Sequence, residues 1–450
     1  MALLATGAVI AFHLAYAFTA LDSLMLLYLF CLFQLTRVKT ARRAFYVGLT
    51  VGFLCCAPQL TCFWNIFGPA AIALWLVLAF WIALFLTLGW SCQVRFGALG
   101  AALLIPFIWT GLEYFRSELY YLRFSWLNAG YAFAGGLRWL SFLHVGVYGL
   151  GILMMAVAAL ISASGKKVRA IAFLSAFSAL AVIANFPSIG ERAMADQKGA
   201  LQVAGVQLEF SSEPEVILSL NKLIKARPVA QLLVMSEYTF DGPVPQKVKV
   251  WCREHQRYLI VGGKEPAAGS QFYDTAFVIG PDGNIVFQQG KRVPIQFFKD
   301  GLPAREQKLW ESPWGKIGLC VCYDLSYTRV TDRLVRLGAQ AIIVPTMDVA
   351  DWGAHQHELH ARVAPIRAAE YGIPVFRLAS SGISQWVDAR GYVTATAPFP
   401  GDGAIISGAL DLKKPGTLPL DRVIAPISVA VTGLIIAWLA ARSFKRKIHH

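Results

Sequence analysis

Charged residues are scarce in this chain of 450 residues, because Asp, Glu, Lys and Arg make up only 15 % of it whereas 56 % is hydrophobic. Its mean hydropathy of +0.52 is too high for an ordinary soluble protein and too low for a chain lying wholly in a bilayer. The sequence also lacks internal repeats, low-complexity segments and a CxxC spacing, which argues against a repeat fold and against a metal or redox motif of that type. We therefore expect a hybrid of a membrane part and a water-exposed part.

Acidic residues are outnumbered, with 27 against 41 basic ones, which gives a net charge of +14. The basic residues flank apolar runs and do not gather in one patch, so a nucleic-acid partner is not expected. Clusters of Lys and Arg follow the second, fourth, sixth and eighth apolar runs. The positive-inside rule places all of these clusters on the cytoplasmic side of a membrane.

A membrane-spanning helix needs roughly 20 mostly apolar residues. The sequence offers about eight candidates, and the N-terminal one lacks the positive flank and cleavage site of a secretion signal, so we expect it to be retained. The candidates are residues 3–20, 22–35, 43–60, 68–90, 98–115, 140–163, 169–186 and 422–441.

These runs predict the domain organisation. Residues 1–190 form a transmembrane bundle of about seven helices, residues 422–441 form the last span, and residues 442–450 form a basic cytoplasmic tail. An even number of spans then places the polar segment 199–413 on the opposite, extracytoplasmic side. In this segment short strand-like runs such as "QLLVMSE" and "AIIVP" alternate with helical runs such as "EPEVILSLNKLIKA", which predicts an α/β domain with helices covering a sheet.

Two cysteines lie in the strand-like run "KIGLCVC". Cys320 and Cys322 share one face of a strand, because side chains alternate with a period of two. Cys322 is at the carboxyl end of the strand, before a polar turn, where α/β sheets expose reactive groups and where backbone N–H donors can lower the pKa of a thiol. Taken alone, a cysteine at a strand end is most often structural, so the position makes Cys322 a surface-facing candidate nucleophile and no more, and we expect Cys320 to be packed in the strand.

Two further strand-like runs end in a charged residue. Glu237 ends "QLLVMSE", and Lys291 follows "NIVFQQG". A strand that ends in a charge is commonly just meeting water. Together with Cys322, however, the two residues offer a general base, a nucleophile and a cation for a developing oxyanion. Nearby positive charge would also favour the thiolate.

The ordered segments "LLVMSEYTF", "GKRVP" and "GLCVCYDLSY" resemble the Glu-Lys-Cys motifs of the nitrilase superfamily. The apolar segments "IPFIWTGLEYFRS" and "HVGVYGLGIL" resemble its membrane branch, the bacterial apolipoprotein N-acyltransferases. The resemblance runs over nearly the whole chain. It implies a helical membrane domain joined to an αββα sandwich, in a multi-pass protein of the bacterial inner membrane.

The resemblance also implies roles and partners. Glu237 would be the general base, Lys291 the stabiliser of the tetrahedral intermediate and Cys322 the nucleophile of a ping-pong acyl transfer. The donor would be a phospholipid and the acceptor the N-terminal amine of a diacylglyceryl-modified lipoprotein. No cofactor or metal is expected, and the protein is expected to act as a monomer.

Departures from the family pattern put the acceptor in doubt. Members carry a second glutamate shortly after the lysine, whereas "KRVPIQFFKDG" has Phe297 at that place, with Gln296 or Asp300 as candidate substitutes. The acid after the nucleophile's tyrosine is Asp324, where glutamate is usual. Two alternatives therefore stay open: a membrane-tethered amidase that uses water as acceptor, and an inactive lipid- or lipoprotein-binding homologue.

Other polar or aromatic residues have plainer interpretations. Tyr323 and Asp324 are expected to support the nucleophile without reacting themselves. Trp352 is either near the pocket, as the resemblance implies, or a packing aromatic. The three histidines of "HQHELH" are favoured as a polar cluster at a helix start, because their spacing would put only two of them on one helical face.

Overall fold

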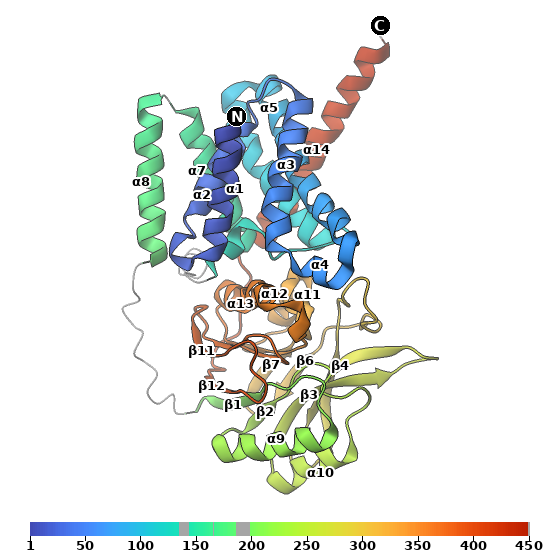
Figure 1. The fold of residues 1–450 in the computed structure, drawn as a ribbon. Coiled ribbons are helices and arrows are strands. Elements are labelled where there is room, and N and C mark those ends of the chain that lie inside the picture. The colour runs from blue at the N-terminus through green and yellow to red at the C-terminus, as the bar shows by residue number, and fades with distance from the viewer. Residues whose placement is uncertain (135–143, 165, 186–198, 449–450) are drawn as a thin grey trace. The chain divides into compact units, whose positions relative to one another are not determined.

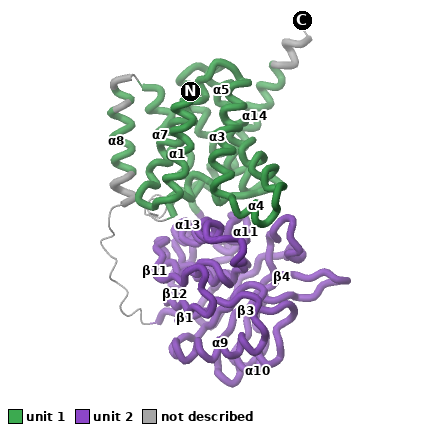
Figure 2. The backbone as a smooth tube through the Cα atoms, viewed as in Figure 1, with its two compact units in different colours: residues 1–187, 419–450 green, residues 188–418 purple. Residues whose placement is uncertain are grey.

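The computed structural model describes residues 1–134, 144–164, 166–185 and 199–448. The chain forms two compact units (Figure 2). The first consists of Met1–Pro187 together with Pro419–His450, and the second of Ser188–Leu418.

The first unit is built of helices (Figure 1). They are α1 (Ala2–Ala17), α2 (Leu24–Leu35), α3 (Ala41–Gln59), α4 (Cys62–Phe67), α5 (Ala71–Tyr114), α7 (Gly146–Ala163), α8 (Lys166–Asn185) and α14 (Asp421–Ile448). Helix α5 is broken at Gly97, whose φ of 67° and ψ of −174° lie outside the helical region and are open to a residue without a Cβ atom. The predicted spans 68–90 and 98–115 therefore lie on either side of this break.

Three helical segments are long and apolar enough to cross a membrane, namely Cys62–Leu119, Gly146–Ala163 and Asp421–Arg442. Shorter apolar helices are Ala2–Ala17, Leu24–Leu35 and Ile171–Leu180. The predicted number of about eight spans is therefore not confirmed, although helices occupy most of each predicted run. Residues 140–143 and 186, at the ends of two predicted spans, lie outside the described residues.

The second unit contains two six-stranded sheets. The first has the order β12 (Ile405–Leu410), β1 (Leu201–Val206), β2 (Leu232–Val234), β3 (Tyr258–Pro266), β4 (Phe272–Ile279), β5 (Ile285–Gly290). The second has the order β11 (Val393–Ala397), β10 (Ser384–Val387), β9 (Val375–Ala379), β8 (Ala341–Thr346), β7 (Gly315–Leu319), β6 (Leu309–Ser312). Strands β1, β2 and β3 are parallel, as are β7, β8 and β9, so within each sheet their carboxyl ends share one edge.

Helices cover the outer faces of both sheets. The flanking helices are α9 (Glu213–Ala226), α10 (Gln246–His255), α11 (Thr328–Arg336), α12 (Ala354–Ala361) and α13 (Val363–Tyr371). Buried side chains of α9 and α10 pack on Leu233 and Leu259 of the first sheet, whereas α13 packs on β9 of the second. Apolar side chains such as Ile260 and Ile343 fill the space between the sheets. The unit is thus the predicted α/β domain, arranged as a helix–sheet–sheet–helix sandwich.

The sequence explains where α9 begins. Ser212 and Glu215 form a capping box, in which the Ser212 N–H donates to the Glu215 carboxylate at 2.7 Å, and Pro214 occupies the first turn. Val216, Leu220 and Leu223 follow at helical spacing and are fully buried, so one face of the helix lies on the sheet.

Candidate active site

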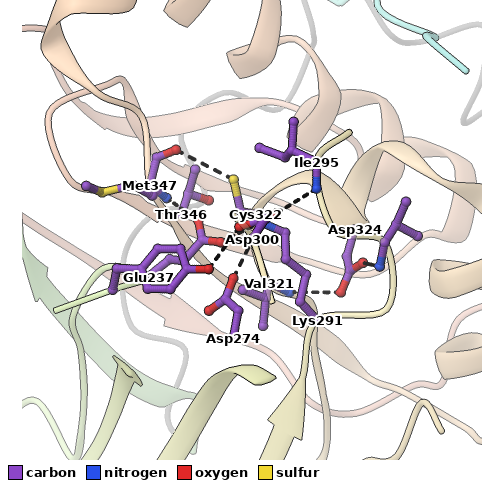
Figure 3. A network of polar contacts seen from close by, with 12 residues as sticks. Glu237, Asp274, Lys291, Ile295, Asp300, Val321, Cys322, Asp324, Thr346 and Met347 are labelled. Carbon is purple, nitrogen blue, oxygen red and sulfur yellow. Dashed lines mark hydrogen bonds and ion pairs between the residues drawn. The ribbon is translucent and has the colours of Figure 1, made fainter. Parts of the chain in front are cut away.

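The structure brings together the three residues that the sequence placed at strand ends. Glu237 follows β2, Lys291 follows β5, and Cys322 begins a short 3-10 turn, η5 (Cys322–Ser326), after β7. They come from both sheets and meet in the interior of the sandwich (Figure 3). None of the three side chains is more than 1 % exposed. The expectation of a surface-facing Cys322 was therefore wrong, because β7 already ends at Leu319 and Cys322 packs in the core between the two sheets.

Glu237 stands at the centre of the contacts. Its Oε1 accepts a hydrogen bond from Lys291 Nζ at 2.6 Å, and its Oε2 accepts one from the Met347 N–H at 2.6 Å. The Cys322 Sγ lies 3.6 Å from the Met347 carbonyl oxygen, at the carboxyl end of β8. One residue of that strand end therefore fixes the carboxylate and contacts the thiol (Figure 3).

Lys291 is surrounded by carboxyl groups. Besides Glu237, its Nζ lies 2.7 Å from Asp300 Oδ2 and 3.4 Å from Asp274 Oδ2. Oxygen atoms of these three acids lie within 4.8 Å of one another, a set of ligand types that a divalent cation could use. The ammonium of Lys291 already supplies a cation there, so the cluster is an ion-pair network and not a metal centre.

Asp300 is the acid that the loop after Lys291 supplies. It is 6 % exposed, and it accepts hydrogen bonds from the Ile295 N–H at 2.6 Å and the Tyr238 hydroxyl at 2.9 Å. Phe297, at the place of the family's second glutamate, is 66 % exposed, and Gln296 is half-buried in the same loop. Of the two candidate substitutes, Asp300 contacts Lys291.

Asp274 was missed by the sequence analysis. It lies near the start of β4 and is fully buried. The turn "PDG" indicates the hairpin of β4 and β5, but a β-bulge at Val278 and Ile279 shifts its register. In the structure Thr275 therefore pairs with Gly290, and the Lys291 N–H donates to the Asp274 carbonyl at 2.7 Å. Because that bulge is not visible in the sequence, no sequence signal pointed to Asp274.

The charges of this cluster set its protonation. Burial by itself lowers the pKa of Lys291, but Asp300 and Glu237 together raise it well above its usual value. Burial has the largest single effect on Glu237 and raises its pKa, but the Lys291 charge and the hydrogen bonds to the carboxylate together hold this pKa below the ordinary range. The result is a buried ion pair at neutral pH.

The pKa of Cys322 moves in the direction opposite to the one expected from the sequence. Burial and the negative charge of Glu237 raise it well above its usual value, and the opposing effect of Lys291 is smaller. The resting group is therefore a thiol beside a carboxylate, which is a group able to accept its proton. The backbone of Cys322 has a φ of 50°, a left-handed conformation that strains a residue with a Cβ atom.

Asp324 connects the nucleophile's turn to the segment after Lys291. Its carboxylate accepts the N–H groups of Arg292 at 2.9 Å and Val293 at 2.7 Å. Burial raises the pKa of Asp324 to about 6 despite these hydrogen bonds. Asp324 thus connects the turn η5 to the segment after Lys291.

The neighbouring Tyr323 packs edge-on against Tyr327, with ring centroids 5.0 Å apart.

Two groups singled out in the sequence lie outside this network. Trp352 is half-buried, with its ring centroid 6.0 Å from that of Phe298. His357 and His360 are buried beside Asp348, and the Asp348–His360 distance is 2.8 Å. Arg377 also forms an ion pair with Asp348, so these histidines belong to a polar cluster that already contains a cation.

Comparison with known proteins agrees with the fold. Residues 211–419 match the carbon-nitrogen hydrolase family, and residues 7–160 match the apolipoprotein N-acyltransferase N-terminal domain. The α/β sandwich is therefore the part of the chain that belongs to the carbon-nitrogen hydrolase class. The two domains occur in order in one chain, and this chain belongs to the apolipoprotein N-acyltransferase family.

Two proteins of this family are similar to the chain over most of its length. The chain is 25 % identical over 423 residues to an apolipoprotein N-acyltransferase of Shewanella oneidensis, covering 79 % of this chain and 80 % of that protein. It is 24 % identical over 404 residues to one of Geobacter metallireducens, covering 78 % and 76 %. The crystal structure of Saccharomyces cerevisiae Nit3, a nitrilase-superfamily member, matches with a TM-score of 0.41 and 22 % identity, covering 52 % of this chain and 95 % of that one.

Proposed function

We propose that this protein moves a fatty acyl chain from a phospholipid, through a thioester on Cys322, to the N-terminal amine of a diacylglyceryl-modified lipoprotein. The observation that carries the proposal is the buried contact of Glu237 with Lys291 and of Cys322 with Met347, in a chain of the apolipoprotein N-acyltransferase family. Such an acyl transfer needs a nucleophile, a base and a cation, and the site holds one of each.

The first half-reaction forms the thioester. Glu237 accepts the thiol proton while the Cys322 sulfur attacks the ester carbonyl of the phospholipid. Lys291 stabilises the negative oxygen of the tetrahedral intermediate, which then collapses as the bond to the glycerol oxygen breaks. Glu237 returns the proton to that oxygen, and a lysophospholipid leaves. Atoms and charges balance without water or a cofactor.

The second half-reaction forms the amide. The α-amine of the lipoprotein attacks the thioester carbonyl, and Glu237 accepts a proton from the amine. When the carbon–sulfur bond breaks, the proton passes to the departing Cys322 sulfur, so the resting thiol is restored. A thiol suits both steps because a thioester is a good acyl donor to an amine.

The domain organisation supports lipid substrates. In our proposal residues 1–190 and 422–441 anchor the enzyme in the bacterial inner membrane. Residues 199–413 form the catalytic domain on the periplasmic side, and the basic loops and residues 442–450 face the cytoplasm. Both substrates are lipids held in a bilayer, so an anchored enzyme meets them at the membrane surface. A monomer is sufficient, since all three reacting groups come from one chain.

Intact mass spectrometry tests the proposal. The purified full-length protein is incubated with phospholipid, and wild type is compared with Cys322→Ala. We expect a fatty-acyl mass increment in wild type alone, and we expect hydroxylamine to remove it. In a second sample, a diacylglyceryl-cysteine peptide should also remove the increment and should itself become acylated through an amide bond. Release of free fatty acid with no acylated peptide would identify water as the acceptor, as in the hydrolytic alternative. The absence of any increment, with an active enzyme run in parallel, would favour a binding protein.

A further inference from the structure

The buried cluster around Lys291 contains more acids than cations. Glu237, Asp274 and Asp300 are between 0 and 6 % exposed, and Lys291 is the single cation that forms ion pairs with them among the described residues. Three ionised carboxylates beside one ammonium would leave two uncompensated negative charges out of water. Burying a charge without a partner is costly, and a carboxyl group in that position takes up a proton instead.

Hydrogen bonding distinguishes the three acids. Glu237 accepts one N–H bond on each oxygen, both at 2.6 Å. Asp300 accepts three bonds, from Lys291 at 2.7 Å, from the Ile295 N–H at 2.6 Å and from the Tyr238 hydroxyl at 2.9 Å. Donors of this kind stabilise the ionised form of a carboxyl group. Both Glu237 and Asp300 are therefore placed to remain charged.

Asp274 has no such support. Its approach to Lys291 is the longest of the three, at 3.4 Å, and neither of its carboxyl oxygens accepts a hydrogen bond from the described residues. It lies beside Glu237, within 4.8 Å between oxygens. Two neighbouring carboxyl groups can share a hydrogen bond only when one of them carries the proton.

We propose that Asp274 is a neutral carboxylic acid in the resting enzyme, that it donates a hydrogen bond to Glu237, and that it thereby positions this base toward Cys322. The inference rests on the proposed function for the role of Glu237. Burial and the Glu237 charge raise the pKa of Asp274 well above its usual value, which agrees with the geometry. A carboxylate offers about four acceptor positions, and Asp274, Lys291, Met347 and Cys322 would together occupy those of Glu237.

The ionisable groups that face Asp274 are Glu237, Lys291, Asp300 and Tyr238. Tyr238 stays neutral, because burial and the neighbouring acids raise its pKa far above the usual value. With Asp274 neutral, the two remaining carboxylates face one ammonium. The net charge of the resting site is then −1 in place of −2, and the Glu237 carboxylate is free to accept the thiol proton.

Two variants distinguish a neutral Asp274 from an ionised one. Asp274→Asn keeps a neutral donor of the same shape, whereas Asp274→Ala removes the donor. The rate of Cys322 alkylation by iodoacetamide is measured against pH on the full-length protein by peptide mass spectrometry, with Cys322→Ala as the control. The acid limb of this profile reports protonation of the Glu237–Cys322 pair.

A neutral donor and a negative charge predict opposite shifts. If Asp274 donates a hydrogen bond to Glu237, Asp274→Ala raises the midpoint of the acid limb by about one pH unit, and Asp274→Asn leaves it close to that of wild type. If Asp274 is ionised, both variants remove a negative neighbour and lower the midpoint. A downward shift in either variant, or no shift in Asp274→Ala, would overturn the inference.

An infrared difference spectrum covers the case in which Asp274→Ala does not fold. Wild type minus Asp274→Asn at neutral pH is expected to show the carbonyl stretch of a protonated carboxylic acid, shifted in D2O, and its absence would overturn the inference. Failure of the Asp274→Asn protein to fold would also overturn the inference, because a neutral side chain of the same shape should be tolerated at this position. Alkylation needs no lipid, so a normal profile without lipid-dependent thioester would refute the proposed function and leave this inference standing.

Discussion

Asp300 provides the sharpest prediction, because it is the acid that contacts Lys291 from the loop in which the family's second glutamate is missing. Asp300→Asn can keep all three hydrogen bonds, with its oxygen toward Lys291 and Ile295 and its NH2 toward the Tyr238 hydroxyl, which can also accept. It loses only the negative charge. Asp300→Ala loses the charge and the three bonds of 2.6–2.9 Å.

The expected magnitudes follow from these contacts. Lys291 keeps its ion pair with Glu237 in Asp300→Ala, but the Ile295 N–H and the Tyr238 hydroxyl lose the acceptor they have in wild type. A buried polar group left without its partner costs about 1–3 kcal/mol, so we expect Asp300→Ala to lower the free energy of unfolding by roughly 2–4 kcal/mol. In Asp300→Asn the loss of one charge-assisted bond to Lys291 is worth about 1.5 kcal/mol. This corresponds to roughly a tenfold slower formation of the acyl-enzyme if the same interaction orients Lys291 in the transition state.

The assay is single-turnover acylation followed by intact mass spectrometry, together with a thermal melt in detergent. Asp241→Ala serves as the matched control, since Asp241 is a carboxylate that also pairs with a lysine but has a side chain that is 90 % exposed, and exposed pairs contribute little. Wild-type acylation by Asp300→Ala would refute the reasoning, as would an equal loss in the Asp241→Ala control.

Three further predictions concern the proposed nucleophile, the proposed base and the turn η5, which begins at Cys322. Cys322→Ser should fold with an unchanged melting temperature but form no acyl-enzyme, which mass spectrometry checks; an acylated serine variant would contradict the assignment of the nucleophile. The rate of acylation should fall at acid pH as Glu237 takes up a proton, and because its pKa is held below the ordinary value by Lys291, full activity should persist through mildly acid pH. A loss already at neutral pH, measured as single-turnover rate against pH, would contradict this sign. Arg367→Met should lower the free energy of unfolding by about 2 kcal/mol or more, because it removes the ion pair with buried Glu370 and the donors to the Leu325 and Ser326 carbonyls of η5; a melting temperature like that of wild type would argue against this support.

Local signals in the sequence were sufficient for the class of the second unit. Alternating apolar runs and helical stretches predicted an α/β domain, since side-chain periodicity is set by backbone geometry within a few residues. The same signals placed Glu237, Lys291 and Cys322 at strand ends. Their meeting was decided by the tertiary structure, because Glu237 and Lys291 follow strands of the first sheet whereas Cys322 follows a strand of the second.

The protonation of the site could not be predicted in the same way. Lys291 suggested a thiolate at Cys322, but burial and the neighbouring Glu237 outweigh the lysine. Both effects depend on the distance between segments far apart in the sequence and on how completely water is excluded. Neither quantity is encoded by a motif.

The sequence by itself determined the hybrid composition, the α/β class and the three strand-end residues, because each depends on local pattern or on the order of motifs. Only the tertiary structure decided that Asp300 and Asp274 join Glu237 around one ammonium. Asp274 reads as an ordinary strand residue and Asp300 as a loop acid, and they acquire significance only when strand pairing and loop closure bring their carboxyl groups within 4.8 Å of Glu237. At that separation, away from water, interactions between charges control which groups keep their protons.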